Sequence, residues 1–326
     1  MVMISFAQFM QAALYDPQRG YYARNIQGIG LGQRGDFTTV PVSSGSLGRA
    51  IAAWLTAQRR LMPEVRHIIE VGAGSGILMQ QVRAAMGWWG RRGLDWHIVD
   101  VSTPLMALQR KRLGSAVQWH ESLPVALDRC QGCALIYHNE VLDAFAPRLL
   151  QWDGRVWQEV YVRRDLQGSW SECFVAAEVL DEEWHSALNP QNSWAAGQRI
   201  EVHEALQQWL QGWISHWKQG AMLSLDYGDL LPRLYHRRPR GTLRGYRMQQ
   251  RVEGAELYEW VGRQDLTVDV NFTDYRRWCE RLGLEEQCWL SQGQFLQQWD
   301  RQPDAAMLDE DGAGGAFKVV AHLRRP

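Results

Sequence analysis

Short apolar runs alternate along the middle of the chain with segments whose apolar residues recur at helical spacing. The first run, 67–71, contains the β-branched pair Ile68 and Ile69, which favours a buried strand, and helical spacing follows from Ile77. Strands that alternate with helices in this way predict a parallel sheet with helices on both faces. Further strands are expected at 96–99, 117–119, 134–137, 221–228, 284–290 and 316–323, and further helices at 46–61, 104–113, 272–282 and 292–299.

The pattern differs on either side of this core. A helix over 4–14 precedes a segment rich in glycine and aromatic residues, which predicts either a lid over a bound ligand or a packed N-terminal arm. Between 148 and 176 the pattern predicts antiparallel strands joined by an Asp-Gly turn, and 180–218 returns to helical spacing. We therefore expect an N-terminal helical arm and lid at 1–62, a core at 63–147 and 219–326, and an inserted α+β subdomain at 148–218.

Three glycines follow the first strand at alternate positions: Gly72, Gly74 and Gly76. Glycine lets the backbone turn tightly and lie against a ligand, and the first amides of the next helix point to the same place. A dinucleotide fold needs a glycine at the sixth position, where Ile77 stands, and an acid about 20 residues further on. Here the acid is Asp100, 28 residues after Gly72, and no Gly-Lys-Ser/Thr run forms a phosphate loop.

This pattern, Glu70-Val71-Gly72-x-Gly74-x-Gly76 with a later acid, resembles the first two motifs of class I S-adenosylmethionine-dependent methyltransferases. The resemblance implies an α/β, Rossmann-like fold with a mostly parallel seven-stranded sheet. It also implies that the glycine turn lies under the methionine part of S-adenosylmethionine and that Asp100 takes the ribose hydroxyls. The alternative for the glycine turn is a purely structural role. Residues 120–122 are expected to lie near the adenine, and the alternative for them is an ordinary strand-to-helix loop. The expected cofactor contacts are Phe37, Thr38, Glu70, Gly72, Ala73, Gly74, Gly76, Asp100, Val101, Glu121, Ser122 and Asn139.

Polar residues also follow the fourth strand of the predicted core, within 138–144. Ligands of such sheets bind at the carboxyl ends of the strands, and in the class I fold this end faces the methyl acceptor. We expect Glu140 to orient the acceptor or take its proton, with Asn139 beside it. Asp143 or Asp226 is expected as a second acid. Capping of the following helix by Asn139 or Asp143 is the alternative.

Several separated stretches resemble one family in particular, the MidA/NDUFAF-type methyltransferases, which include a mitochondrial complex I assembly factor and bacterial relatives. The stretches are Leu14-Tyr15-Asp16-Pro17, Gly20-Tyr21-Tyr22, Gly35-Asp36-Phe37-Thr38-Thr39, Glu70 to Gly76, Asn139-Glu140-Val141-Leu142-Asp143-Ala144, Leu225-Asp226-Tyr227-Gly228, Gly241-Thr242-Leu243-Arg244-Gly245-Tyr246 and Asp265-Leu266-Thr267-Val268-Asp269-Val270-Asn271-Phe272. The resemblance implies S-adenosylmethionine as donor, S-adenosylhomocysteine as product and, for the mitochondrial member, methylation of a protein arginine. Three positions depart from the family: Val42 replaces an acid, Gln249 a histidine and Asn271 an aspartate.

Composition and charge limit the size of the core and the classes of partner that the chain can bind. With 326 residues, 46% of them hydrophobic, the chain can bury one large core or a core with a substantial insertion. The net charge of −1 gives no bulk attraction for nucleic acid, although the seven arginines in 233–251 leave nucleic-acid contact open beside a solvated or substrate-facing loop. No run of about 18 apolar residues predicts a membrane span. The N-terminus lacks the basic start of a signal peptide, so we expect a cytoplasmic protein.

The five cysteines, an odd number, agree with that location. Cys130 and Cys133 form a CxxC pair, but no second pair or neighbouring histidine cluster is visible in the sequence, so no metal is expected. The expected partners are a protein substrate and the small-molecule donor, and a homodimer is left open. The alternatives are a non-catalytic assembly factor that binds the cofactor, or a methyltransferase for a small molecule or nucleic acid. The stretch 139–142 is not the Asn/Asp-Pro-Pro-aromatic motif of amino-methylating nucleic-acid enzymes.

Overall fold

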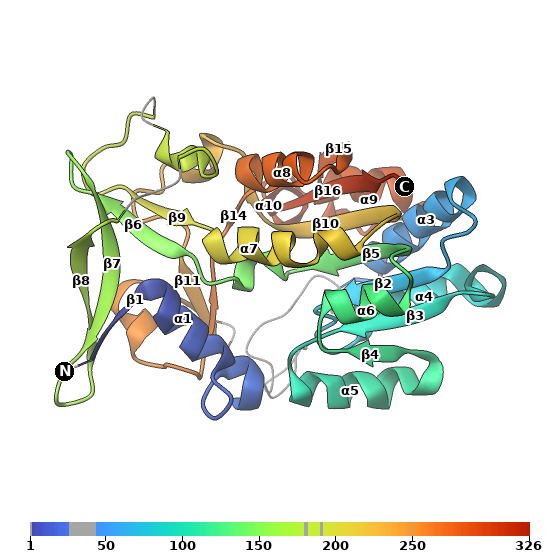
Figure 1. The fold of residues 1–326 in the computed structure, drawn as a ribbon, viewed down its shortest axis with the longest axis horizontal. Helices are drawn as coiled ribbons and strands as arrows, with labels where there is room; N and C mark the ends of the chain where they lie inside the picture. Colours follow the sequence, from blue (N-terminus) through green and yellow to red (C-terminus); the bar gives the residue numbers. More distant parts are fainter. Residues whose placement is uncertain (1, 26–43, 179–181, 190–191, 249) are drawn as a thin grey trace. The chain divides into compact units, whose positions relative to one another are not determined.

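The computed structural model describes residues 2–25, 44–178, 182–189, 192–248 and 250–326 (Figure 1). The chain divides into two compact units, each made of three segments. The first unit contains Met1–Ile26, Leu142–Trp209 and Gly228–Trp278, and the second contains Gln27–Val141, Leu210–Tyr227 and Cys279–Pro326. The expected boundaries of the arm, the core and the insertion stay predictions.

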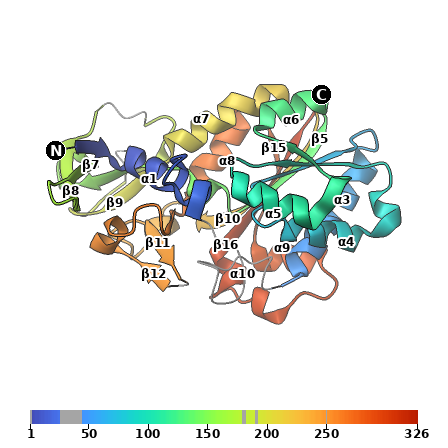
Figure 2. The same cartoon turned by 90° about the horizontal axis from the view of Figure 1, so that it is seen from below.

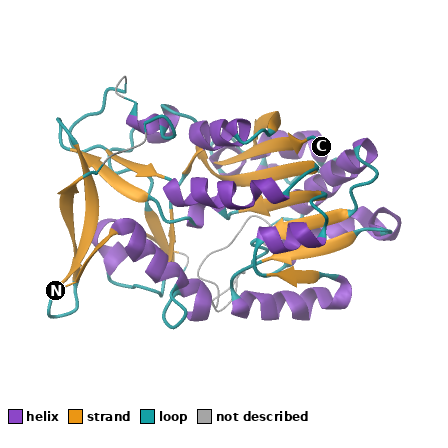
Figure 3. Cartoon of the chain, viewed as in Figure 1, coloured by secondary structure: helices purple, strands orange, loops and turns teal. Residues whose placement is uncertain are grey.

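A mostly parallel sheet forms the centre of the second unit (Figure 3). Its strands run in the order β15 (Glu285–Ser291), β16 (Phe317–Arg324), β10 (Gly220–Asp229), β5 (Ala134–Asn139), β2 (His67–Val71), β3 (Asp95–Val99) and β4 (Gln118–His120). The strands from β4 to β10 pair in parallel, whereas β16 is antiparallel to both of its neighbours. The predicted fold class is confirmed, because this is the sheet that the alternation of apolar runs and helical segments predicts.

One face of this sheet packs against α3 (Ser46–Leu61), α4 (Ile77–Arg91) and α9 (Gln292–Trp299). A single hydrophobic core joins these helices to the strands, and its members include Trp54, Ile68, Leu78, Leu135, Leu223, Phe295 and Val319. Strand residues alternate between the two faces, so Ile69 and its neighbour Ile136 lie on the opposite face. On that face α6 (Leu123–Arg129) contacts β3 and β4. The predicted helix α5 (Thr103–Leu113), which precedes β4, contacts α4, and its Leu113 belongs to the core on the first face.

The first unit contains an antiparallel sheet. Its strands are β1 (Val2–Ser5), β7 (Trp157–Arg164), β6 (Arg148–Trp152) and β9 (Arg199–Val202), with β8 (Trp170–Ala176) beside β7. The predicted turn between β6 and β7 is held by Asp153, whose carboxylate accepts the amides of Arg155 and Val156 at 2.7 and 2.8 Å. Antiparallel strands are therefore present where the sequence predicts them.

Two strands of this sheet overlap segments for which helix was expected. The helix expected over 4–14 is present but begins two residues later, and the expectation of helix across 180–218 is wrong for the residues of β9. The first helix, α1 (Phe6–Tyr15), begins only after Ser5, whose hydroxyl and amide form a capping box with Gln8. The residues before Ser5 are therefore free to pair with β7 as β1. Likewise, 180–218 is not helical throughout, because β9 precedes α7 (Glu204–Trp213) and pairs with β6.

A second, three-stranded sheet of the first unit was not predicted. It consists of β12 (Gln250–Val252), β11 (Arg244–Arg247) and β13 (Asp265–Thr267), and Figure 2 shows β11 and β12 in orange. The short β14 (Val270–Asn271) pairs with the end of β10, and α8 (Phe272–Arg281) follows at once. Among the helices of the described ranges, none has the length and apolar character needed to cross a membrane.

Candidate active site

The glycine turn after β2 adopts a left-handed backbone. The φ angles are 64° at Gly72, 52° at Gly74 and 79° at Gly76, values that favour glycine over any other residue. The amide of Gly76 donates to the carbonyl of Ala73 at 2.7 Å, which closes the turn directly before α4 begins. A Cβ atom on Gly72 would lie only 2.5 Å from Cγ2 of Val141, in the segment after β5. The backbone of the turn, which carries no side chain at Gly72, therefore lies against the segment after β5 that was predicted to contact the methyl acceptor.

Glu70, the predicted acid before the turn, is buried at the end of β2. Its Oε2 accepts the hydroxyl of Tyr137 at 3.0 Å, across the β2–β5 pair. Burial raises the pKa of Glu70 to about 8, the charge of Asp100 adds to the rise, and the hydrogen bonds of Tyr137 and of the Met79 amide oppose it. Glu70 thus connects β2 to β5 and to the start of α4, the helix that follows the glycine turn.

Asp100 directly follows β3 and is buried. Its Oδ1 accepts the amide of Ser102 at 2.9 Å, and its Oδ2 accepts Nε2 of Gln109 at 2.6 Å. Gln109 also donates to the carbonyl of Gly74 at 2.9 Å and accepts from the indole of Trp119 at 3.1 Å. Burial raises the pKa of Asp100, and these hydrogen bonds oppose the rise. The structure thereby connects the two motif elements, the acid and the glycine turn, through one amide side chain.

Gln109 is a site residue that the sequence interpretation missed. It lies on the buried face of α5 together with Leu105 and Leu113, at a spacing of four residues. The apolar residues of this helix predict an apolar side chain at position 109. The glutamine found there is the signal that could have identified Gln109 as a site residue. Arg112, from the same helix, donates to the carbonyl of Ser75, so a second side chain of α5 supports the turn.

The remaining predicted cofactor residues have different environments. Val101 and Glu121, which follow β3 and β4, are exposed to solvent, and Ser122 precedes α6 without capping it through its side chain. These three positions are open to a ligand at the carboxyl ends of the strands. Phe37 and Thr38 lie outside the described residues, as do Val42 and Gln249.

The segment after β5 is shaped around Glu140. Its φ of 54° is left-handed, a conformation that costs a residue with a side chain about 1–3 kcal/mol and is typical of functional sites. Asn139 Nδ2 donates to Glu140 Oε1 at 3.0 Å, and the amide of Glu140 donates to the carbonyl of Leu225 in β10 at 3.0 Å. The predicted pair of Asn139 and Glu140 therefore lies together at the end of β5.

Asp226 supports this segment from the neighbouring strand. It is fully buried in β10, where its Oδ2 accepts the amide of Val141 at 3.0 Å and its Oδ1 accepts the amide of Tyr227 at 2.9 Å. Because both carboxylate oxygens accept backbone amides, this geometry suits a residue that positions Glu140 rather than one that contacts the acceptor.

Asp143, the other predicted acid, belongs to the first unit. It lies in η3 (Leu142–Ala144), where its Oδ2 accepts the hydroxyl of Thr267 at 2.7 Å and its carbonyl accepts the amide of Val268 at 3.2 Å. Burial raises the pKa of Asp143, and the hydrogen bond from Thr267 opposes the rise. Asp143 therefore joins two stretches of the family resemblance that are far apart in the sequence.

Other stretches of the resemblance also meet within the first unit. The hydroxyl of Tyr15 donates to the carbonyl of Ala144 at 3.4 Å, and Tyr22, from η1 (Tyr21–Asn25), donates to Asp265 Oδ1 at 2.9 Å. The rings of the two tyrosines stack with their centroids 5.5 Å apart. Asn271, where the family has an aspartate, donates its amide to Asp274 at 2.9 Å, which an ionised aspartate could not do.

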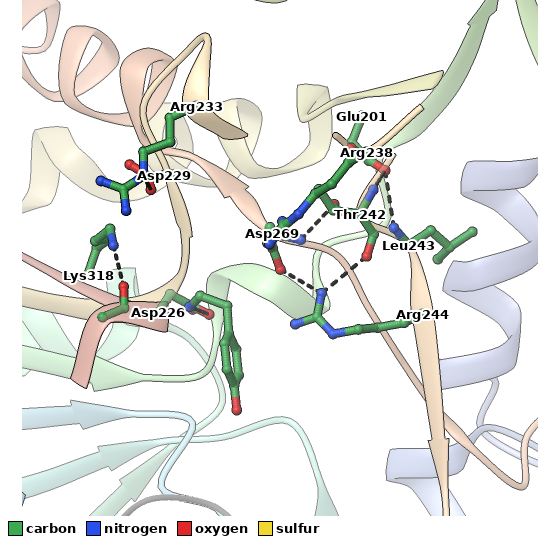
Figure 4. A network of polar contacts seen from close by, with 12 residues as sticks. Glu201, Asp226, Asp229, Arg233, Arg238, Thr242, Leu243, Arg244, Asp269 and Lys318 are labelled. Atoms are coloured by element: carbon green, nitrogen blue, oxygen red, sulfur yellow. Dashed lines mark hydrogen bonds and ion pairs between the residues drawn. The ribbon is translucent and has the colours of Figure 1, made fainter. Parts of the chain in front are cut away.

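A buried ion-pair network occupies the arginine-rich segment (Figure 4). Arg244 Nη1 donates to Asp269 Oδ1 at 2.5 Å and to the carbonyl of Thr242 at 3.1 Å, and Arg238 forms a second ion pair with Asp269. The amide of Asp269 donates to the Thr242 hydroxyl, while Glu201 accepts the amide of Thr242 at 2.7 Å. Arg244 is therefore part of the interior, not of a solvated loop.

Two histidines lie near Cys130 in the folded chain, although no histidine cluster was visible beside it in the sequence. His67 of β2 and His97 of β3 approach this thiol in the folded chain, although neither is close to it in the sequence. The CxxC spacing alone could not reveal this cluster, because it depends on the pairing of two strands with each other.

The sequence matches a family model described as "Putative S-adenosyl-L-methionine-dependent methyltransferase" over residues 47–288. The match includes the glycine turn, Asp100 and the segment after β5, whose geometry is given above. The chain belongs to this methyltransferase family. S-adenosylmethionine is therefore its methyl donor, which confirms the predicted cofactor and reaction class.

Individual relatives agree with this assignment. The protein arginine methyltransferases NDUFAF7 of Danio rerio and Mus musculus, both mitochondrial, are 25% and 26% identical over 304 and 312 residues. These alignments cover 84% of this chain and 68% and 66% of the relatives, so the chain spans about two thirds of their length. A superfamily member from Burkholderia thailandensis, crystallised with S-adenosyl-homocysteine, superposes with a TM-score of 0.87 at 26% identity, covering 99% of this chain and 88% of that chain. The predicted MidA/NDUFAF-type family is confirmed.

These relatives overturn one expectation. The cytoplasmic location predicted from the sequence is wrong, because the curated relatives are mitochondrial proteins. The prediction rested on the composition of the N-terminal residues and on the odd cysteine count. Neither feature reports directly on the compartment in which a protein works.

Proposed function

We propose that this methyltransferase modifies an arginine side chain of a protein. The observation that carries the proposal is the Asn139–Glu140 pair, held in a strained turn at the carboxyl end of β5, with Val141 packed on Gly72 of the glycine turn. A guanidinium has a pKa above about 12, so an arginine acceptor needs a carboxylate that fixes its plane and takes its proton. The NDUFAF7 relatives, which are named protein arginine methyltransferases, support the same acceptor.

The residues of the second unit fit the cofactor. Gly72, Gly74 and Gly76 leave backbone uncovered for the methionine part, and Asp100, oriented by Gln109, would accept the ribose hydroxyls. We assign Val101, Glu121 and Ser122 to the adenine side of the cofactor. We also include Ala73, within the turn, and the buried Glu70, directly before it, in the cofactor site. When bound, S-adenosylmethionine supplies a methyl group on a positively charged sulfur.

Glu140 would have two tasks in the transfer. A carbon–nitrogen bond forms as the carbon–sulfur bond breaks, and the guanidinium must lose one proton for the product to be stable. Glu140 accepts N–H groups of the guanidinium and takes that proton, Asn139 holds its carboxylate, and Asp226 fixes the backbone that follows. Positioning of the two reactants can contribute about 7–11 kcal/mol to such a displacement.

We favour a protein over a nucleic acid as the acceptor. Four of the seven arginines between 233 and 251 form ion pairs with acids of the chain: Arg233 with Asp229, Arg238 and Arg244 with Asp269, and Arg251 with Glu253. Arginines whose charge is already compensated contribute little to phosphate binding.

The proposal is tested with donor that carries a labelled methyl group and a cell lysate. Mass spectrometry should locate the label on arginine residues of a protein. Glu140→Gln should lower the transfer rate by about 10²–10⁴-fold, as expected for loss of a general base, while calorimetry shows unchanged binding of S-adenosylhomocysteine. The control is Glu64→Gln, a change at an exposed glutamate of the same unit. Label on a small molecule or on another side chain, or full activity of Glu140→Gln, would contradict the proposal.

A further inference from the structure

Three potential metal ligands converge on the face of the sheet that α6 covers. His67 is the first residue of β2, His97 lies in β3, and Cys130 directly follows α6. His67 Nδ1 lies 3.0 Å from His97 Nε2, and Cys130 Sγ lies 3.7 Å from the same nitrogen. The ligand atoms of the three residues all lie within 4.8 Å of one another. We propose that His67, His97 and Cys130 bind a zinc ion.

The two separations that involve His97 are close to those in the coordination geometry of zinc. Tetrahedral zinc has Zn–N distances of about 2.0–2.1 Å and Zn–S distances of about 2.3 Å, which place two nitrogens about 3.3 Å apart and nitrogen and sulfur about 3.6 Å apart. The observed 3.0 and 3.7 Å differ from these values by a few tenths of an ångström. Imidazole and thiolate together select zinc rather than magnesium or calcium, which prefer oxygen ligands.

Hydrogen bonds among the three side chains explain the cluster less well than a metal ion does. His97 Nε2 has a single site in the ring plane, which either donates one proton or offers one lone pair. Both His67 Nδ1 and Cys130 Sγ approach that one site. A zinc ion would bind all three atoms at once.

The surroundings of the cluster also suit a metal. The other nitrogen of the His97 ring, Nδ1, lies 2.9 Å from His120 Nε2, so that with Nε2 on the metal the ring can donate its remaining proton to His120. Such a second hydrogen bond fixes the tautomer and the orientation of a metal-binding histidine. On the other side, Asp95 Oδ2 lies 3.7 Å from His67 Nδ1, and these two side chains are 56% and 27% exposed. The ion can therefore enter here, with a water molecule as fourth ligand.

The metal site would stabilise the fold of the enzyme and would take no part in the methyl transfer. It joins the beginning of β2, the middle of β3 and the end of α6. The same two strands lead at their carboxyl ends into the glycine turn and Asp100. A metal bound only by the folded chain stabilises it against unfolding. The proposal is independent of the identity of the methyl acceptor.

The experiment uses the full chain without an affinity tag, stripped with a chelator and then desalted after addition of zinc or cobalt chloride. The wild-type protein should retain one molar equivalent of metal by mass spectrometry. Its cobalt form should show a thiolate-to-cobalt absorption band, and zinc should raise its melting temperature. Cys130→Ser should lose the retained metal and the band. Cys133→Ser, the matched change at the half-buried cysteine of the same CxxC pair, should keep both.

Circular dichroism checks that Cys130→Ser is folded, and His67→Gln, at the partly exposed edge of the cluster, provides a second variant that should also lose the metal. The proposal is overturned if the wild-type protein retains no zinc after desalting. It is equally overturned if folded Cys130→Ser retains as much metal as the wild type.

Discussion

Val141 packs directly against the backbone of Gly72, so that the residue after Glu140 touches the turn proposed to hold the cofactor. A Cβ atom on Gly72 would come within 2.5 Å of Val141 Cγ2. The segment proposed to bind the acceptor and the turn proposed to bind the donor therefore depend on each other. A change at either position should affect both substrates.

Gly72→Ala tests this dependence. The added methyl group overlaps Val141, and an L-residue at a φ of 64° costs about 1–2 kcal/mol, so binding of S-adenosylhomocysteine should weaken and the melting temperature should fall. The double variant Gly72→Ala/Val141→Ala removes the overlap but keeps the backbone strain. Calorimetry should show that it recovers part of the lost affinity. Wild-type affinity in Gly72→Ala would show that the cofactor does not lie against this turn.

Gln109 offers a test of the connection between Asp100 and the turn. Gln109→Met keeps the approximate shape of the side chain but removes the hydrogen bonds to Asp100 and to the Gly74 carbonyl. A buried acceptor without a donor costs about 1–3 kcal/mol, so the free energy of unfolding should fall by that amount and cofactor affinity should fall with it. Gln80→Met, at an exposed position of α4, is the control. If both variants bind S-adenosylhomocysteine equally well, Gln109 has no part in the site.

The core of the fold could be predicted because its signals are local. The central strands of the large sheet, such as β2, β5 and β10, contain short apolar runs, and the covering helices carry apolar stripes, so these signals do not depend on distant residues. The strands β1, β9 and β11 are short, and they form strands only by pairing with segments elsewhere in the chain, as β1 does with β7. Periodicity within such a segment cannot reveal that pairing.

In the candidate site, too, some features could be predicted from the sequence and others could not. The glycine turn and Asp100 follow strands in the sequence, so their place at the carboxyl ends of the sheet could be predicted. The support that Asp226 gives to Val141 depends on the register of β10 beside β5, and the approach of His97 to Cys130 depends on how α6 covers β3. These relationships arise only when the sheet is assembled.

The buried carboxyl of Glu70 predicts a specific pH dependence of stability. Its pKa is raised to about 8 in the folded chain, against 4.5 as the ordinary value. Below the lower value both states carry the proton, whereas between the two values only the folded state keeps it. The free energy of unfolding should therefore fall as the pH rises through this window, by up to about 1.4 kcal/mol per pH unit.

Glu70→Gln removes the titrating group while keeping an oxygen that can accept the Tyr137 hydroxyl. Denaturant unfolding across the same window should give a flatter curve for the variant than for the wild type, because other titrating groups contribute equally to both. Two parallel curves would show that Glu70 is ionised in the folded chain throughout the window.

Arg244 provides a test of the first unit. Its side chain is 7% exposed and that of Asp269 is 9% exposed, and removal of Arg244 leaves the buried Asp269 with Arg238, whose side chain is 49% exposed, as its remaining ionic partner. Arg244→Met should therefore lower the free energy of unfolding by up to about 3–5 kcal/mol, the cost of breaking a buried pair. Arg251→Met, in a pair with Glu253 in which both side chains are more than half exposed, should leave stability unchanged, because surface pairs contribute little. Chemical denaturation of both variants makes the comparison, and equal stability of the two would show that the buried pair contributes no more than the exposed one.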